Sequence, residues 1–228
     1  MLYAIGDLHL SLEADKPMDV FGKGWHDYEN RIKYGFSSLK DDDICVICGD
    51  ISWSMSLEKS LLDFKFIDDL PGRKIILKGN HDYWWSTAAK TKRFFRQNGI
   101  KSIDILHNNF FSDGDIAICG TRGWFYEEET GSEHDKKVMM REVSRLETSL
   151  KLAEGFDKKY CFLHYPPLYK NYECREITQL MKKYGVTRCC YGHIHSAGHK
   201  TAVQGMVDGI EYIMVSADYL GFTPIKVR

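Results

Sequence analysis

The stretch KIILKGNHDYWW, residues 74–85, joins a buried-strand pattern to an unusual ending. Its first half is an apolar, β-branched run of the kind that forms a strand, and the run stops at Gly79. Three polar residues that can bind metals or carry protons follow, namely Asn80, His81 and Asp82, and two tryptophans come next. A simple turn would require only a glycine and one polar residue. The stretch therefore predicts a strand that carries functional side chains at its carboxyl end.

Six other short apolar runs share this composition and stop at Gly, Asp or Asn. They cover residues 2–7, 43–50, 115–121, 159–165, 187–193 and 211–218. Their apolar character is nearly continuous rather than alternating, which is typical of strands buried on both faces.

Amphipathic helical patterns lie between these runs. Residues 56–70 carry an apolar stripe behind Ser56, a residue type that caps helix N-termini. The stripe in residues 135–154 is too short for a coiled coil, so we expect a helix lying on a sheet. A third pattern, residues 174–184, ends at Gly185, the residue type that commonly follows a helix. Strands alternating with helices predict an α/β layered fold.

Composition indicates a globular chain without strong net charge. The 228 residues suffice for a sizeable core, and we expect one domain over residues 1–228. The 31 Lys and Arg nearly balance the 32 Asp and Glu, so no global field favours nucleic acid or a membrane surface. No apolar stretch is long enough to cross a bilayer, and the strand-like run from Leu2 leaves no room for a signal peptide. We therefore expect a cytoplasmic location and no membrane partner.

The cysteines have a structural interpretation. Seven of them, an odd number without a secretion signal, predict reduced thiols. Cys45 and Cys48 lie within one strand-like run, where an offset of three residues points the two sulfurs to opposite faces. We therefore expect core packing there, and also at Cys189 and Cys190, rather than a metal site.

Five of the strand-like runs end in side chains that can bind metals or transfer protons. These side chains are Asp7, His9, Asp50, Asn80, His81, His164, His193 and His195. A single histidine or Gly-Asp pair at a strand end is usually a structural turn residue. In an open α/β sheet, however, ligands bind outside the carboxyl ends of the strands. The joint pattern therefore predicts one crevice with a metal site.

The motifs Asp-x-His, Gly-Asp, Gly-Asn-His-Asp, the lone His in FLHYPP and Gly-His-x-His resemble the signature of the calcineurin-like metallophosphoesterase superfamily. They occur in the same order as in that family, from residue 7 to residue 195. The resemblance implies an α/β fold with four layers, in which two mixed β-sheets are flanked by helices. It also implies a metal-dependent phosphohydrolase that uses a metal-bridging hydroxide at a dinuclear site.

The resemblance also implies roles for individual residues. One metal would be held by Asp7, His9 and His195, the other by Asn80, His164 and His193, and Asp50 would bridge the two. Such ligands suit Mn²⁺, which we favour, and also Fe, Zn²⁺, Co²⁺ or Ni²⁺. His81 would protonate the leaving group or stabilise charge on the phosphoryl oxygens. Asp82 would orient the ring of His81, or serve only as a turn or cap residue.

Two further residues are candidates for substrate binding. Trp84 is expected on the pocket wall, where an indole can stack on a ring, although each tryptophan taken singly is more typical of a core. Arg122 is either a ligand for a phosphate oxygen or a surface arginine in a turn. The irregular segment 11–30, which contains Trp25, is a candidate lid. We assign no role to His26, His107, His134 or His199.

Departures from subfamily patterns narrow the substrate class. Protein Ser/Thr phosphatases of the superfamily carry Asp-Arg-Gly after the second motif and Gly-Asn-His-Glu at the third, whereas this chain has GDISWS and GNHD. We expect hydrolysis of a small or medium phosphoester. A diester is favoured because Ser52, Trp53 and Lys78 stand where monoesterases place arginines. The alternatives are a phosphomonoesterase, a nuclease for which RNA or DNA is only the substrate, and a non-catalytic scaffold, which would not need His81.

Overall fold

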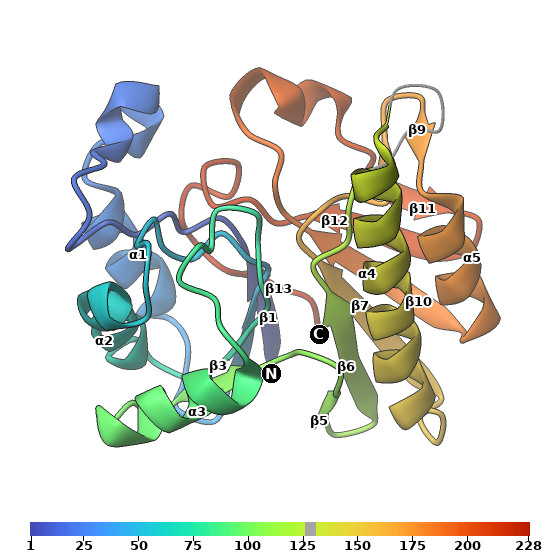
Figure 1. The fold of residues 1–228 in the computed structure, drawn as a ribbon, viewed down its shortest axis with the longest axis horizontal. Coiled ribbons are helices and arrows are strands. Elements are labelled where there is room, and N and C mark those ends of the chain that lie inside the picture. Colours follow the sequence, from blue (N-terminus) through green and yellow to red (C-terminus); the bar gives the residue numbers. More distant parts are fainter. Residues whose placement is uncertain (126–130) are drawn as a thin grey trace.

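The computed structural model describes residues 1–125 and 131–228, and its strands form two large sheets (Figure 1). In the first sheet, of order β13-β1-β2-β3-β4, the parallel strands are β1 (Leu2–Ile5), β2 (Ile44–Ile47), β3 (Arg73–Ile76) and β4 (Ile103–Ile105). Strand β13 (Ile225–Lys226) pairs antiparallel with β1.

The second sheet has the order β11-β12-β10-β7-β6-β5. Its parallel strands are β6 (Ile116–Thr121), β7 (Lys158–Leu163), β10 (Val186–Tyr191) and β12 (Ile210–Met214). The edge strands β5 (Phe111–Asp113) and β11 (Gly205–Val207) are antiparallel. A separate hairpin pairs β8 (Leu168–Tyr169) with β9 (Tyr172–Glu173).

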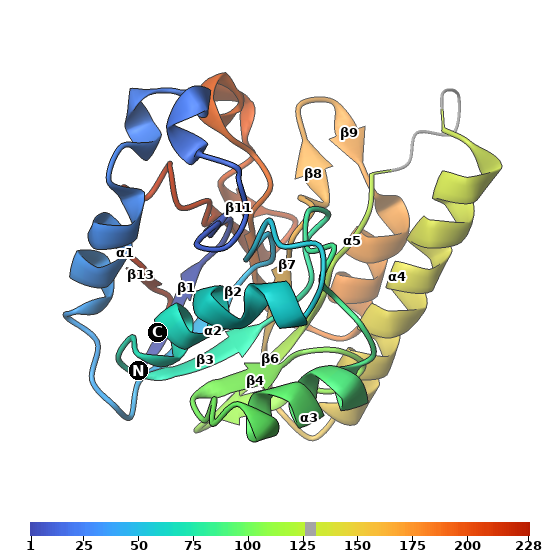
Figure 2. The same cartoon turned by 60° about the vertical axis from the view of Figure 1, so that its left-hand side comes forward.

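Helices cover the outer face of each sheet, as the two views show (Figures 1 and 2). The first sheet is covered by α1 (Tyr28–Phe36), α2 (Leu61–Asp68) and α3 (Ala88–Gln97). The second is covered by α4 (Glu133–Leu152) and α5 (Arg175–Lys183). Short 3₁₀ helices are η1 (Met18–Phe21), η2 (Lys23–Trp25), η3 (Glu58–Ser60) and η4 (Ser196–Thr201).

The core consists of three hydrophobic clusters, two between a sheet and its helices and one between the sheets. Cys45 packs toward the helices of the first sheet, whereas Cys48 packs toward the second sheet. Both are fully buried, and all seven cysteines are free. Burial on both faces explains why the strand runs are apolar throughout. The expected core packing of the cysteines and the sandwich of two mixed sheets flanked by helices are confirmed.

The seven strand-like runs all form strands, but some helix boundaries differ from expectation. Ser56 accepts a hydrogen bond from the Lys59 amide at 3.4 Å, but the residue that precedes α2 is Ser60, and η3 lies between Ser56 and α2. Helix α4 begins earlier than expected, because Ser132 and Asp135 form a capping box. Gly185 follows α5 with a φ of +69°, as the pattern predicted. No helix among the described residues is long and apolar enough to cross a membrane.

The segment between β1 and α1 is more ordered than its sequence suggested. It contains η1 and η2, and it is anchored by Met18 and Trp25, which are buried. The amide of Leu12 donates a hydrogen bond to Asp63 of α2 at 2.9 Å. The segment is therefore tied to the first sheet and its helices.

Candidate metal centre

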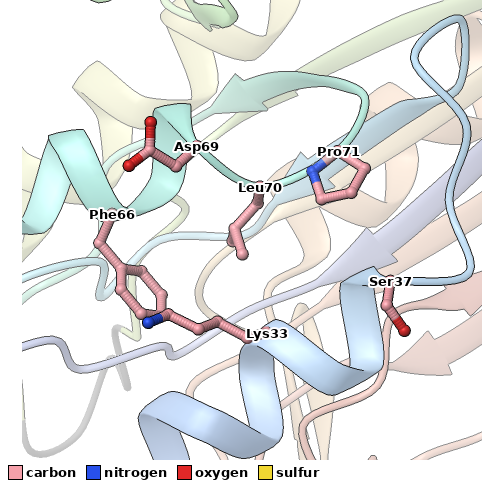
Figure 3. A pocket seen from close by; sticks show the side chains of 6 residues that line it. All are labelled: Lys33, Ser37, Phe66, Asp69, Leu70 and Pro71. Atoms are coloured by element: carbon pink, nitrogen blue, oxygen red, sulfur yellow. The ribbon is translucent and has the colours of Figure 1, made fainter.

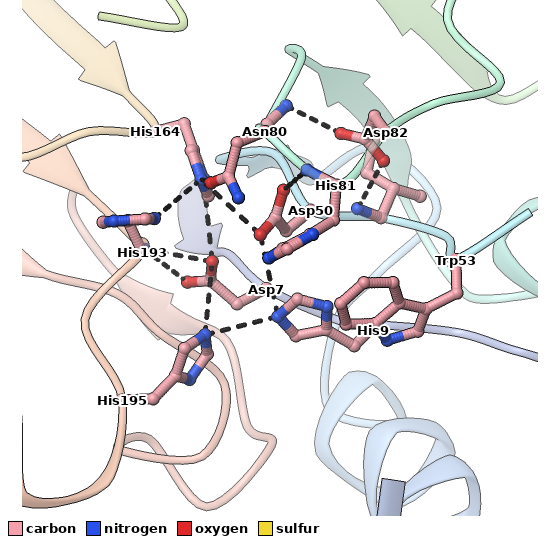
Figure 4. A network of polar contacts seen from close by, with 12 residues as sticks. Asp7, His9, Asp50, Trp53, Asn80, His81, Asp82, His164, His193 and His195 are labelled. Carbon is pink, nitrogen blue, oxygen red and sulfur yellow. Dashed lines mark hydrogen bonds and ion pairs between the residues drawn. The ribbon is translucent and has the colours of Figure 1, made fainter. Parts of the chain in front are cut away.

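The structure brings the eight polar residues of the strand ends together (Figure 4). They follow β1, β2 and β3 of the first sheet and β7 and β10 of the second. Backbone bonds continue beyond the regular strands and hold these ends side by side. The amide of Asp7 donates to the carbonyl of Gly49, and the amide of Gly192 donates to that of His164.

One group of potential ligands contains Asp7, His9 and His195, whose ligand atoms all lie within 4.8 Å of one another. The Nε2 atoms of His9 and His195 face each other at 3.3 Å, and Nε2 of His195 lies 3.8 Å from an oxygen of Asp7. Two imidazole nitrogens and a carboxylate that converge in this way form a site suited to a cation.

A second group contains Asp50, His164 and His193, again within 4.8 Å. Nε2 of His164 lies 3.2 Å from Nδ1 of His193 and 2.6 Å from the amide oxygen of Asn80. Nδ1 of His164 lies 3.0 Å from the carbonyl of Cys48 and donates to it, which leaves Nε2 for a ligand.

The carboxylate of Asp50 lies between the two groups. Its Oδ2 atom is 3.8 Å from Nε2 of His9 and 3.6 Å from Nε2 of His164. Its Oδ1 atom accepts a hydrogen bond from the amide of His81 at 2.8 Å. One carboxylate therefore faces both candidate positions.

Several of these residues have a left-handed backbone that is uncommon outside glycine. The φ angles are +58° for Asp7, +48° for His9, +50° for Asp50 and +73° for His193. Such conformations cost about 1–3 kcal/mol each and are concentrated at functional sites. Here they turn the chain sharply after three strands, so that side chains point into the crevice.

Two motif glycines allow the backbone to approach the carboxylates closely. A Cβ atom at Gly79 would overlap the carboxylate and amide of Asp50, and one at Gly192 would lie 2.5 Å from an oxygen of Asp7. Any side chain at either position would displace a carboxylate from the crevice. The glycines of the motifs therefore have a packing role at the centre itself.

The electrostatics of the group favour bound cations. Burial raises the pKa of Asp7 to about 8, a shift that His195 opposes and the nearby Asp50 increases. Burial also lowers the pKa of His164 to about 3 and that of His193 to about 2, so both imidazoles are neutral and able to coordinate. Divalent cations would offset the cost of burying two carboxylates. The set of carboxylate, amide oxygen and imidazole fits Mn²⁺, Fe, Co²⁺, Ni²⁺ or Zn²⁺.

Asp218 is a functional candidate that the sequence reasoning missed. Its Oδ1 atom lies 2.9 Å from Nδ1 of His195, which directs Nε2 of that ring toward the centre. Burial alone would lower the pKa of His195, but the bond to Asp218 and the charges of Asp7 and Asp50 raise it to about 9. His199, to which we assigned no role, also lies 3.2 Å from Asp218. The signal was present, because the run at residues 211–218 ends in this carboxylate.

His81 lies beside the ligand groups rather than in either of them. Its ring is 4.2 Å from that of Trp53 and 5.8 Å from that of His9, between centroids. Nδ1 lies 3.3 Å from the hydroxyl of Tyr83, a contact that the sequence did not suggest. Burial lowers the pKa of His81, whereas the charge of Asp50 opposes that shift.

Asp82 binds the backbone rather than the ring of His81. Its fully buried carboxylate accepts hydrogen bonds from the amides of Gly79 at 2.7 Å, Ile51 at 2.8 Å and Ser52 at 3.2 Å. Burial and the nearby Asp50 raise its pKa to about 7. Among the described residues it is Tyr83 that bonds the ring of His81. The contacts of Asp82 therefore match those of a turn residue that caps backbone amides.

The structure corrects the expected position of Trp84. This residue is 2% exposed and packs edge-on against Phe64 at 4.8 Å, with its indole N–H bonded to Asp82. Trp53 instead stacks on His9 with ring centroids 5.0 Å apart, as seen in Figure 4. The aromatic rings beside the ligands come from more than one loop, because Tyr165, which follows β7, lies 4.3 Å from His193 between ring centroids.

Arg122 contacts the centre through its backbone. Its carbonyl accepts the amides of His164 and Tyr165. Its guanidinium lies 3.3 Å from Glu142 of α4 and 4.5 Å from the ring centre of Trp124. The side chain is thus committed to α4, and no described contact directs it toward the ligands.

A pocket elsewhere in the molecule contains none of these residues (Figure 3). It lies between α1 and α2 and has a volume of about 260 Å³. Its lining consists of Lys33, Ser37, Phe66, Asp69, Leu70 and Pro71. The pocket contains no histidine and none of the candidate ligands of the strand ends.

Comparison with known proteins agrees with this fold. A family model described as calcineurin-like phosphoesterase matches residues 2–197. Curated proteins give no significant match. The structure of phosphopantetheinyl hydrolase (PptH) from Mycobacterium tuberculosis has a TM-score of 0.60 at 13% identity, with 100% of this chain and 96% of that chain covered. TT1561 of Thermus thermophilus has a TM-score of 0.59 at 12% identity, covering 93% and 87%. These two structures are similar in fold.

Proposed function

Because the chain belongs to the calcineurin-like phosphoesterase family and is a metal-dependent phosphoesterase, we propose that it hydrolyses phosphodiesters at a dinuclear centre. Asp7, His9 and His195 would hold one cation, Asn80, His164 and His193 would hold the other, and Asp50 would serve both. The observation that carries this proposal is the position of Asp50, whose Oδ2 atom lies 3.8 Å from one imidazole and 3.6 Å from the other. We favour Mn²⁺, in keeping with oxygen and imidazole ligands.

Cations bound at this centre supply Lewis acidity, which lowers the pKa of water and neutralises charge on the phosphoryl oxygens. His81 then carries the proton that the leaving alkoxide needs. The hydroxyl of Tyr83 occupies Nδ1 at 3.3 Å, so Nε2 is the nitrogen free for that transfer. The backbone bond from His81 to Asp50 fixes the imidazole relative to the ligands.

A diester is favoured by the charges and the aromatic surface around the centre. A monoester dianion requires positive charge beyond the metals, and the guanidinium of Arg122 is already paired with Glu142. A diester monoanion requires less positive charge than a monoester dianion. Its second substituent gains from an aromatic surface beside the other ligand group, where the ring of Phe125 lies 5.6 Å from that of His193 between centroids. The alternative is a phosphomonoesterase, in which Arg122 would leave Glu142 to bind the substrate.

The physiological setting is also a proposal. We propose a cytoplasmic protein that acts as one domain over residues 1–228, since its seven cysteines are buried and free, as expected in a reducing compartment. Its substrate is a small or medium phosphoester. The net charge of the chain is only −1, so no global field favours nucleic acid.

Parallel assays test the reaction. The Mn²⁺-loaded protein should hydrolyse bis-p-nitrophenyl phosphate with a kcat/KM about tenfold above that for p-nitrophenyl phosphate, which corresponds to about 1.4 kcal/mol in the barrier. A clear preference for the monoester would overturn the diester proposal. If the wild type prefers the monoester, loss of the monoester preference in Arg122→Ala would show that Arg122 supplies the additional positive charge.

A further inference from the structure

The segment between β1 and α1 places one lysine above the aromatic wall of the centre. The ammonium of Lys16 lies 3.6 Å from the ring centre of Trp53. The same indole stacks on His9 at 5.0 Å and lies 4.2 Å from His81, between ring centroids. The ammonium therefore shares one indole with a candidate ligand and with the proposed proton carrier.

The position of Lys16 is fixed by contacts on both sides of it in the chain. Before it, the amide of Leu12 is bonded to Asp63. After it, Met18 is buried and its sulfur accepts the indole N–H of Trp53 at 3.1 Å. The side chain of Lys16 is half-buried. It lies over the ring of Trp53, and Met18 holds that ring through its indole N–H.

The charge of Lys16 has no acidic partner in residues 1–125 and 131–228. No carboxylate there lies within 4.0 Å of the ammonium, although Glu13, Asp15 and Asp19 belong to the same segment. An ammonium over an indole is attracted by the electron-rich face of the ring, and it retains N–H donors for an anion. Its surroundings therefore suit a negatively charged ligand group that approaches along the indole.

We propose that Lys16 and Trp53 form a leaving-group subsite that selects substrates with an anionic group, such as a carboxylate or second phosphate, on the alcohol that departs. This inference rests on the proposed function, because it is His81 that marks the leaving-group side of the scissile phosphate. Trp53 packs against the apolar part of the leaving group, and Lys16 binds its charge. Lys16 is thereby a specificity-determining residue of the reaction.

Matched substrates test the subsite. Phenyl phosphate and 3-carboxyphenyl phosphate differ by one carboxylate, which changes the acidity of the departing phenol little. Their kcat/KM ratio is measured with the Mn²⁺-loaded protein, in whichever ester form, mono- or diester, is hydrolysed faster. The wild type should prefer the carboxylated compound by about three- to tenfold, as expected for one partly screened ion pair. The preference should shrink as salt is added.

The variants separate charge from structure. Lys16→Met should bring the kcat/KM ratio of the two substrates to about one, and Lys16→Arg should retain the preference. Lys23→Met is the matched control, because Lys23 is an exposed lysine of the same segment. A wild type without preference, or a Lys16→Met variant that keeps it, would overturn the subsite. An equal loss on both substrates would also overturn it, since that pattern indicates a structural role.

Equilibrium binding keeps this test independent of turnover. Calorimetry on the Mn²⁺-loaded protein should show that 3-carboxyphenylphosphonate binds about three- to tenfold tighter than phenylphosphonate, and that Lys16→Met removes the difference. Equal affinities in the wild type would contradict the subsite even if hydrolysis is observed. Tighter binding of the carboxylated compound without hydrolysis of any ester would support the subsite and instead contradict the proposed function.

Discussion

Replacing Asp218 with asparagine tests whether the carboxylate behind His195 tunes one half of the centre. The Oδ1 atom lies 2.9 Å from Nδ1 of His195, so the carboxylate fixes the tautomer that turns Nε2 toward Asp7 and His9. An amide keeps the shape but loses the charge, and it can present its NH₂ group instead of an acceptor. Partners of metal-bound histidines typically contribute a factor of about 10–100 in metal affinity.

We expect Asp218→Asn to weaken Mn²⁺ binding about tenfold, or about 1.4 kcal/mol, at only one of two positions. Competition titration with a chelating dye resolves the two affinities. Asp208→Asn is the control, because Asp208 is an exposed carboxylate paired with Lys182. Unchanged affinity, or an equal loss at both positions, would refute the assignment of Asp218 to the group of His195.

Three further perturbations address the proton carrier, the close glycine contact and the buried charges. His81→Ala should retain metal but lose rate by roughly 10²–10⁴-fold, with a smaller loss for nitrophenyl than for alkyl leaving groups; equal losses would indicate charge stabilisation instead. Gly192→Ala should reduce metal content in elemental analysis, because its Cβ would lie 2.5 Å from Asp7, whereas Gly155→Ala, where a Cβ meets open space, should not. In the metal-free protein, the raised pKa values of Asp7, about 8, and His195, about 9, mean that the native state binds more protons than the unfolded chain between pH 7.5 and 8.5. In that window the histidines whose pKa burial lowers, such as His164 and His193, are largely neutral in both states. The free energy of unfolding should therefore fall by about 1 kcal/mol or more across that window in urea titrations, and saturating Mn²⁺ should remove the slope; a rise with pH would contradict this.

The central strands and the residues that follow them were predictable because their signals are local. A strand buried on both faces must be apolar at every position, as in the run from Ile44 to Ile47. Polar side chains directly after such strands must lie at one edge of the sheet. The candidate ligands could therefore be placed together without knowledge of the loops.

The edges of the sheets and the outer helices were less predictable. Strands β4, β5 and β11 have three residues each, so they lack a run long enough to be recognised, and β4 and β5 also contain polar residues. Helix α3 is rich in Lys and Arg, and only Thr91 and Phe95 are buried in it. Its stability depends on the sheet that it covers, which local sequence does not reveal.

The surroundings of the centre were predicted least well. Trp84 and Trp53 both follow motif residues, yet the indole of Trp84 turns into the core to bond Asp82 while that of Trp53 turns to His9. Which way each ring turns depends on contacts between loops that are distant in sequence. Asp218 lies 23 positions from His195, so its bond could be found only once β10 and β12 were known to be neighbours.

The number of cations bound is the most direct test of the account. Equilibrium dialysis of the wild type against Mn²⁺, followed by elemental analysis, should give close to two equivalents per chain. Asp50→Asn should lower occupancy at both positions, because a neutral amide bridges two cations poorly. A fully loaded wild type that holds a single ion, or an Asp50→Asn variant that retains two, would contradict the dinuclear centre.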